Sequence, residues 1–101
     1  MQFIVTGRDG TDPKALERRM AVREAHLKQA DGLKAEGKLL YAAALLDDAG
    51  KMAGSVMICE FASRADLDGW LAVEPYVTGK VWAAVEVRPC KVGPAFVKNP
   101  A

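Results

Sequence analysis

Four apolar runs separated by two helix-like segments set the strongest constraint on how this chain folds. The runs span residues 2–6, 39–46, 53–61 and 81–87, with one helix-like segment after the first run and another after the third. Each run has the length and composition of a strand and is bounded by turn-forming residues. The order β-α-β-β-α-β, with right-handed connections, predicts a four-stranded antiparallel sheet with both helices on one face. This is the ferredoxin-like α+β fold.

Local signals set the expected helix boundaries. An Asp or Ser residue before a segment free of internal proline supplies an N-cap, and a following Gly or Pro ends the helix. These signals predict a helix over residues 13–36, capped by Asp12, and a second over about residues 63–73, capped by Ser63 and stopped by Pro75.

Length, charge and cysteine content narrow the class of protein. A chain of 101 residues is expected to form one domain, residues 1–101. Its 14 Lys and Arg residues against 13 Asp and Glu residues give a net charge of +1, which argues against a nucleic-acid partner. Cys59 and Cys90 are too few to staple a secreted domain, and no apolar run reaches the roughly 18 residues of a membrane span. We therefore expect a cytoplasmic protein without a membrane partner, whose two thiols are free and have no assigned role.

Two of the expected strands are apolar on both faces. Side chains alternate along a strand, and both sets of alternating positions in residues 53–61 and 81–87 are mostly apolar, with the valines of the last strand opposite Trp82. Helices cover one face of the sheet, and a face left in water should carry polar side chains. The sequence therefore predicts a homodimer through the outer sheet faces. The tail over residues 92–101, with Phe96 and Val97, is expected to pair with the second copy.

The first helix carries polar residues on its expected apolar face. At about 100° per residue, Arg19, Arg23 and His26 fall inside an arc of apolar side chains that comprises Leu16, Met20, Val22, Leu27, Ala30 and Leu33. A structural interpretation is that the arginines pair with carboxylates at the sheet edge and that His26 is a satisfied buried histidine. A functional interpretation is that His26, the sole histidine, transfers protons, because imidazole ionises near neutral pH.

Proton transfer by His26 requires a carboxylate that orients the imidazole. Glu74 is the favoured partner, because it ends the second helical segment, where its side chain can turn back towards the space between helices and sheet. Ser55, at the start of a strand, supplies a hydroxyl near the same space. The other carboxylates considered are Glu60, Asp66, Asp68 and Glu86.

A set of short motifs resembles the YciI-like (YCII) family. In order, they cover nearly the whole chain: Arg23-Glu24-Ala25-His26-Leu27, Glu36-Gly37-Lys38-Leu39-Leu40, Gly54-Ser55, Phe61-Ala62-Ser63 with Trp70, Glu74-Pro75-Tyr76 and Val87-Arg88-Pro89. The resemblance implies a dimeric α+β barrel, in which two ferredoxin-like protomers pack sheet against sheet. It also implies an acid–base pair of a histidine and an aspartate in a cleft of the protomer.

The resemblance assigns residues to that site. The family's histidine falls at His26, and the aspartate of its Asp-Pro-Tyr motif falls at Glu74, whose side chain is one methylene longer. Ala43-Ala44 stands where the family usually has Gly-Pro after the second strand. The expected substrate-binding residues are Arg23, Ser55 and Tyr76, with the guanidinium holding an anionic group of the substrate.

Three functions stay open at the level of sequence. The first is an enzyme without cofactor or metal that uses the His26 and Glu74 pair for isomerisation, elimination or hydrolysis of a small anion. The resemblance implies an aromatic or lactone-like substrate, since the family and its superfamily include a dehydrochlorinase of chlorinated hydroquinones and an isomerase of a lactone. The second is a non-catalytic module that binds a small molecule, and the third is an accessory dimer. Haem, used elsewhere in the superfamily, is not expected here, because it would need a much wider pocket.

Overall fold

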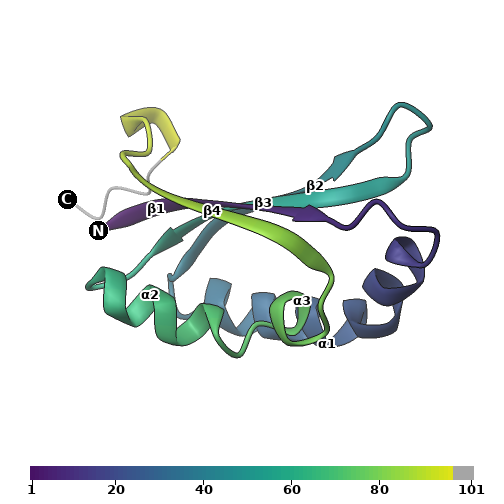
Figure 1. The fold of residues 1–101 in the computed structure, drawn as a ribbon. Coiled ribbons are helices and arrows are strands. Elements are labelled where there is room, and N and C mark those ends of the chain that lie inside the picture. The colour runs from purple at the N-terminus through teal and green to yellow at the C-terminus, as the bar shows by residue number, and fades with distance from the viewer. Residues whose placement is uncertain (97–101) are drawn as a thin grey trace.

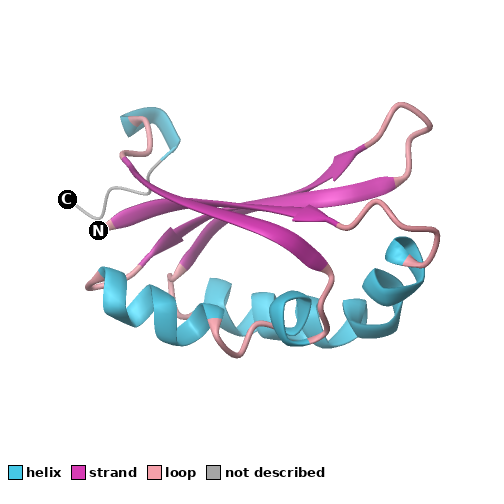
Figure 2. Ribbon diagram, in the orientation of Figure 1, coloured by secondary structure: helices cyan, strands magenta, loops and turns pink. Residues whose placement is uncertain are grey.

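The computed structural model, which describes residues 1–96, contains a sheet with the strand order β2-β3-β1-β4. The strands are β1 (Gln2–Asp9), β2 (Leu39–Leu46), β3 (Met52–Glu60) and β4 (Trp82–Cys90), and each neighbouring pair is antiparallel. The helices α1 (Ala15–Ala35), α2 (Arg64–Leu71) and α3 (Pro75–Thr78) lie on one face of this sheet (Figure 1, Figure 2). The predicted ferredoxin-like α+β fold is confirmed, with α3 as an added turn of helix.

β1 and β4 are longer than predicted. β1 continues past Gly7 to Asp9, and a Cβ on Gly7 would lie 2.3 Å from the Trp82 ring. Glycine at this position therefore makes room for the indole instead of ending the strand. β4 runs through Pro89 to Cys90. An edge strand tolerates proline, because it has an unpaired side on which the missing N–H costs no ladder bond.

The start of α1 differs from the prediction. The N-cap is Lys14, without a side-chain capping bond, and the helix begins at Ala15 instead of residue 13. Asp12 is therefore not the cap. Its carboxylate accepts a hydrogen bond from Arg18 Nη1 at 2.8 Å, and this ion pair lowers the pKa of Asp12 to about 2.

The second helical segment is split in two. Ser63 caps α2 as predicted, since its hydroxyl accepts the Asp66 backbone N–H at 3.1 Å. The helix ends at Leu71, before the predicted residue 73, so Pro75 does not stop it. Pro75 is instead the first residue of α3. Proline suits this position because a first-turn N–H has no partner within the helix.

The face that α1 turns towards the sheet is one side of the predicted apolar arc, on which Val22, Ala30 and Leu33 pack against the core. Leu16, Met20 and Leu27 are 37%, 51% and 43% exposed, whereas Arg19 and His26 are buried. Residues seven apart lie on one side of a helix, so Arg19 and His26 face the sheet together. Buried polar side chains need hydrogen bonds, which Arg19 makes through Nη1 and Nη2 and His26 makes through Nδ1.

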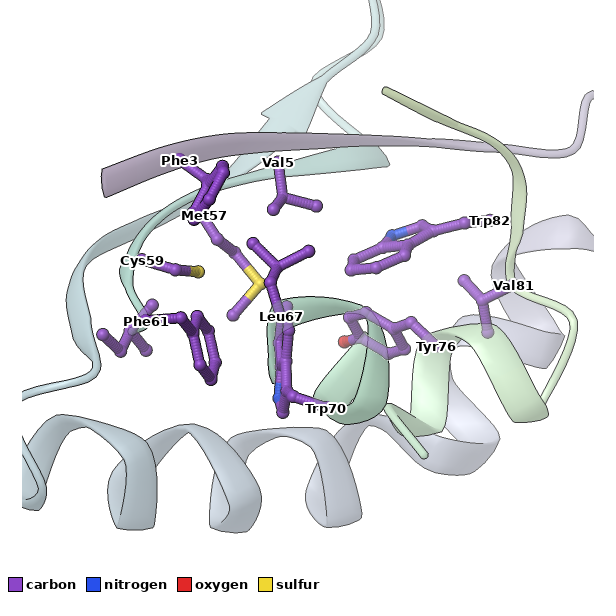
Figure 3. Close-up of a cluster of buried hydrophobic side chains, with 11 residues drawn as sticks. Phe3, Val5, Met57, Cys59, Phe61, Leu67, Trp70, Tyr76, Val81 and Trp82 are labelled. Atoms are coloured by element: carbon purple, nitrogen blue, oxygen red, sulfur yellow. The ribbon is translucent and has the colours of Figure 1, made fainter. Parts of the chain in front are cut away.

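The main core lies between the sheet and the helices (Figure 3). Trp82 belongs to this core, because a register shift at the end of β1 turns its indole to the helix side, the side of Val85 and Val87. The predicted placement of Trp82 opposite these valines was therefore wrong. The outer face of β4 carries Glu86 and Arg88 instead. The full core cluster is Phe3, Val5, Leu39, Met57, Cys59, Phe61, Leu67, Trp70, Tyr76, Val81 and Trp82.

The segment after β4 lies beyond the sheet. It contains the short 3₁₀ helix η1 (Pro94–Phe96), in which Phe96 is 85% exposed. Val97 and the rest of the predicted pairing tail lie outside the described residues. None of the helices over residues 1–96 is long and apolar enough to span a membrane.

Candidate active site

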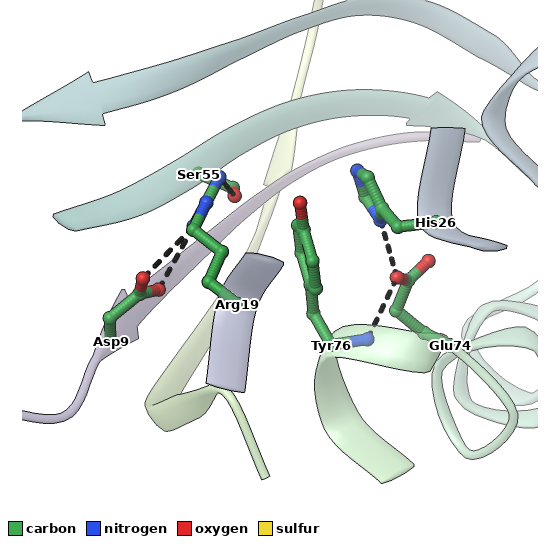
Figure 4. Close-up of polar contacts among 6 residues, drawn as sticks. All are labelled: Asp9, Arg19, His26, Ser55, Glu74 and Tyr76. Carbon is green, nitrogen blue, oxygen red and sulfur yellow. Dashed lines mark hydrogen bonds and ion pairs between the residues drawn. The ribbon is translucent and has the colours of Figure 1, made fainter. Parts of the chain in front are cut away.

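His26 of α1 and Glu74 of α3 meet beneath the sheet (Figure 4). The imidazole Nδ1 lies 2.5 Å from Glu74 Oε1, and both side chains are buried. Glu74 is the N-cap of α3, where the same Oε1 accepts the Tyr76 backbone N–H at 3.1 Å. An ionised carboxylate only accepts hydrogen bonds, so with Glu74 ionised the Nδ1–H group is the donor of this hydrogen bond. The lone pair of the imidazole is then on Nε2.

The Tyr76 ring lies between the side chains of His26 and Arg19 (Figure 4). The His26 and Tyr76 ring centroids are 3.9 Å apart, with 13° between the planes. Arg19 Cζ lies 4.6 Å from the Tyr76 ring centroid, which is a cation–π distance. Trp82 meets both rings edge-on, at 6.5 Å from the His26 centroid and 5.6 Å from that of Tyr76. The imidazole is therefore fixed by ring packing as well as by its hydrogen bond.

Arg19 is held by groups from two strands. Its Nη1 donates to the two carboxylate oxygens of Asp9, at 3.0 and 3.1 Å, and its Nη2 donates to Ser55 Oγ at 2.8 Å. All three side chains are buried. Asp9 therefore balances the Arg19 charge, as the structural interpretation of the sequence anticipated for this arginine. The Ser55 hydroxyl accepts from Arg19 and keeps its own proton for another acceptor.

These side chains border a pocket of about 140 Å³ between α1 and the β2–β3 half of the sheet. A cavity of about 150 Å³ holds a benzene ring, so the pocket has room for one small ring. Ala43-Ala44, where the resemblance implies Gly-Pro, forms part of the β2 wall. The lining residues are Arg19, Arg23, His26, Leu27, Ala42, Ala43, Ala44, Met52, Ser55, Met57 and Tyr76.

Arg23 is a cation of this pocket that has no ion-pair partner among residues 1–96. It is partly buried and lines the cavity, and the ion pairs within residues 1–96 do not include it. The anticipated pairing of Arg23 with a carboxylate is thus absent from the described part of the chain. Asp9 pairs with Arg19, and Glu74 contacts His26, so among residues 1–96 the Arg23 guanidinium is the cationic group of the pocket that no carboxylate contacts.

The structure brings the five predicted site residues together and places the other carboxylates elsewhere. His26, Glu74, Arg23, Ser55 and Tyr76 lie at or directly beside one pocket. Asp66 lies in the first turn of α2, and the remaining three carboxylates pair outside the pocket: Glu60 with the Met1 amino group, Asp68 with Arg64 and Glu86 with Arg88.

Sequence reasoning missed Asp9 and Trp82. Phe3, Val5, Gly7 and Asp9 alternate along β1, and this period of two would have placed Asp9 on the inner face had the strand been extended past Gly7. The inward position of Trp82 depends on the register shift between β1 and β4. The sequence carries no comparable signal for this shift. Within residues 1–96, no group of three or more His, Cys, Asp or Glu side chains is placed to hold a metal ion.

A model of the YCII-related domain matches residues 1–91, a span that contains every site residue described above. The chain belongs to the YCII-related family. Relatives of this YCII-related protein include an uncharacterized protein of Haemophilus influenzae, 36% identical over 97 residues, and protein YciI of Escherichia coli, 35% identical over 97 residues. Each alignment covers 90% of this chain and 97% of the relative. The resemblance found in the sequence motifs is confirmed.

A solved structure similar to this YCII-related protein is 5-chloro-2-hydroxyhydroquinone dehydrochlorinase from Burkholderia phenoliruptrix, in complex with 2,5-dihydroxybenzoquinone. The TM-score is 0.80 at 27% sequence identity. The match covers 94% of this chain and 98% of the dehydrochlorinase chain.

Proposed function

We propose that this YCII-related protein is an enzyme that transfers protons on a small anionic ring compound, with His26 as the base and Glu74 as the group that orients it. The observation that carries the proposal is the 2.5 Å contact between His26 Nδ1 and Glu74 Oε1, made by two buried side chains beside a pocket. Such a pair leaves Nε2 free to accept a proton from a molecule in the pocket.

The arrangement suits elimination or isomerisation. His26 Nε2 takes a proton from the substrate, and Glu74 stabilises the imidazolium that forms. In an elimination the electron pair left on the substrate expels an anion such as chloride, and in an isomerisation the proton returns at another atom. Positioned bases of this kind contribute about 10²- to 10⁴-fold to rate. The similarity to a dehydrochlorinase of a hydroxyhydroquinone supports elimination. The step needs no electron acceptor, so the proposal includes no cofactor.

The substrate class follows from the pocket. Its volume of about 140 Å³ admits one ring, and Ala42 and Met57 supply apolar walls. Arg23, which no carboxylate of residues 1–96 contacts, favours a ligand with one negative group, because a guanidinium binds such a group through charge-assisted hydrogen bonds. 2,5-Dihydroxybenzoquinone, bound in the similar structure, has this size and an acidic hydroxyl, and is therefore a suitable probe.

The test uses 5-chloro-2-hydroxyhydroquinone as substrate and chloride release as the readout. The wild-type protein should release chloride faster than the uncatalysed reaction, and His26→Gln should lose about 10²- to 10⁴-fold of that rate. Lys28→Gln, on the exposed side of the same helix, is the matched control and should keep it. The affinity of each protein for 2,5-dihydroxybenzoquinone is measured in parallel, from the change in ligand absorbance.

These two readouts, together with exchange of substrate hydrogen for solvent deuterium, separate the three functions. Turnover that depends on His26 supports the enzyme. If the protein binds the quinone but shows neither chloride release nor exchange of substrate hydrogen for solvent deuterium, the result supports a binding module instead of an enzyme. Neither binding nor turnover, over a panel of small hydroxyquinones, phenols and lactones, would favour the accessory protein.

A further inference from the structure

The Tyr76 hydroxyl is a polar group of the pocket to which the residues described here offer no partner. Tyr76 is only 1% exposed, and its backbone is fixed at both ends: its N–H donates to Glu74 Oε1 at 3.1 Å and its carbonyl accepts the Val81 N–H at 3.0 Å. Among residues 1–96 no hydrogen bond involves the phenol oxygen, although Tyr76 lines the pocket. A residue held this firmly presents its hydroxyl in one place.

The hydroxyl and the proposed base face the same space. Figure 4 shows the Tyr76 oxygen and the outer nitrogen of His26 pointing the same way, towards the sheet. Because the two rings are stacked 3.9 Å apart and only 13° from parallel, a ring in the pocket can place neighbouring atoms against both groups. Packing of Arg19 on Tyr76, at 4.6 Å from the ring centroid, prevents the phenol from swinging away.

The phenol is a donor at neutral pH. Burial raises the pKa of Tyr76, and the opposing effect of the Arg19 and Arg23 charges is smaller. The Tyr76 hydroxyl therefore keeps its proton at neutral pH, at which His26 is proposed to act as the base. A donor that is already in place, and partly shielded from water, stabilises developing negative charge without reorganisation.

We propose that the Tyr76 hydroxyl donates a hydrogen bond to the substrate oxygen on which negative charge develops as His26 Nε2 removes a proton. The proton moves from the substrate to Nε2, and the electron pair that held it passes onto the substrate oxygen. The Tyr76 proton stays on Tyr76, and the charge leaves the oxygen again when the anion is expelled or the proton returns. Tyr76 is then a catalytic residue, and Arg19 is a positioning residue that acts through it. This inference rests on the proposed function.

The test compares Tyr76→Phe with Tyr41→Phe. Phenylalanine keeps the ring between Arg19 and His26 and removes the hydroxyl alone. With 5-chloro-2-hydroxyhydroquinone, Tyr76→Phe should lower kcat by about 10²- to 10³-fold, the effect of losing one oxyanion donor, and change KM only about threefold. Tyr41 is the other tyrosine and is 63% exposed on β2, so Tyr41→Phe should behave as wild type. A loss confined to KM, or no loss, would overturn the proposed role.

A second measurement does not require turnover. Tyr41→Phe leaves Tyr76 as the sole tyrosine, so ¹³C labelling at Cζ reports on this phenol alone. Addition of 2,5-dihydroxybenzoquinone should shift the Cζ signal and raise the pH at which Tyr76 ionises, because an anionic acceptor favours the protonated phenol. An unchanged titration in a protein that binds the quinone would overturn the inference. If the wild-type protein turns nothing over, the proposed function fails, and this titration alone decides whether Tyr76 donates to a bound oxyanion.

Discussion

The length of the Glu74 side chain determines how His26 is held. Its Oε1 serves two donors at once, the imidazole Nδ1 at 2.5 Å and the Tyr76 N–H at 3.1 Å. An aspartate at this position can still cap α3 but draws the carboxylate back by about the length of one C–C bond, about 1.5 Å. We therefore expect Glu74→Asp to fold normally and to lower kcat/KM by about 10- to 100-fold, the cost of a misplacement near 1 Å.

Because His26 is the sole histidine, the orienting role of Glu74 can also be tested without substrate. ¹⁵N NMR of His26 distinguishes a protonated Nδ1 from a protonated Nε2. The wild-type spectrum should show the proton on Nδ1, and Glu74→Leu, which has no acceptor, should lose that preference. A wild-type tautomer with the proton on Nε2 would contradict the role given to Glu74. So would a Glu74→Leu protein that keeps full turnover.

The two cysteines should differ in reactivity. Cys59 is fully buried in the core, and burial raises the pKa of its thiol to about 12, whereas Cys90 is half-buried at the end of β4. The thiolate is the reactive form, so iodoacetamide at pH 8 should label Cys90 and leave Cys59 unmodified until the protein unfolds. Peptide mass spectrometry measures both sites. Equal labelling of the two in the native protein would contradict the burial of Cys59.

The raised pKa of Cys59 makes the free energy of unfolding depend on pH in the alkaline range. The unfolded chain loses the Cys59 proton near the ordinary thiol pKa of 9.0, whereas the folded protein keeps it to about 12. The unfolded state therefore binds fewer protons in this interval, and the free energy of unfolding should fall as pH rises from about 9 towards 12. The raised pKa of Tyr76 acts in the same direction. Urea denaturation at pH 8 and pH 10.5 tests the sign.

At the scale of elements, the contact between β1 and β4 positions the Trp82 indole against the His26 and Tyr76 rings of the site. Trp82 lies over Gly7 and meets the His26 and Tyr76 rings edge-on. Gly7→Ala would place a methyl group within 2.3 Å of the indole, so it should destabilise the protein by about 1–3 kcal/mol through overpacking. It should also lower turnover, because Trp82 must move away from His26.

A second glycine supplies the opposite expectation. Gly32 lies on the exposed side of α1, and a Cβ there would meet nothing within 4 Å. Gly32→Ala should therefore stabilise the protein by about 0.5–1 kcal/mol, since alanine has less conformational freedom to lose in a helix. Urea denaturation of both variants gives the comparison. A Gly7→Ala protein as stable as Gly32→Ala would show that the indole does not lie on Gly7.

The positions of the helices and strands in the sequence were more predictable than which side of each element is buried. Strand 39–46 and the Ser63 cap agree with the structure because local composition decides them. The side of α1 that is buried does not follow from local composition, since Arg19 is stable in the interior only when Asp9 and Ser55 reach it. Asp9 lies 10 residues before Arg19, at the end of the preceding strand, and Ser55 lies 36 residues after it. His26 was placed correctly on the buried side of α1, although Leu16, Met20 and Leu27, on the other side of the predicted arc, are exposed.

The predictability of the site divides in the same way. Glu74 could be chosen because its position between a helical segment and Pro75 constrains where its side chain turns. The stacking of His26 on Tyr76 could not be foreseen, because it depends on α3 being a separate turn of helix. Asp9 could be assigned to the site only if β1 was expected to continue through Gly7. A glycine considered in isolation indicates a turn.

At the scale of the whole molecule, the outer face of the sheet is the surface that a single chain leaves open. Ile4 of β1 pairs with Ile58 of β3, which in turn pairs with Tyr41 of β2, so an apolar area crosses three strands. A groove of about 440 Å³ on this face is lined by these residues and by the exposed Phe96. Exposed apolar patches of this kind mark association sites. We propose that a second copy of the chain covers this face, with the polar outer side of β4 at the rim.

The dimer and the site make a joint prediction. Ile58→Lys puts a charge at the centre of the apolar area and should weaken self-association by about 30-fold or more, equivalent to about 2 kcal/mol at a central interface position. Arg88→Gln, on the polar outer face of β4, is the control and should leave association unchanged. Sedimentation velocity over a range of concentrations measures both. The 140 Å³ pocket lies on the helix side of the sheet, opposite to the face that carries Ile58. A monomeric Ile58→Lys protein should therefore still bind 2,5-dihydroxybenzoquinone, at a lower melting temperature. Loss of binding in a folded monomer would mean that the second copy completes the site, and an unchanged dimer would place the interface elsewhere.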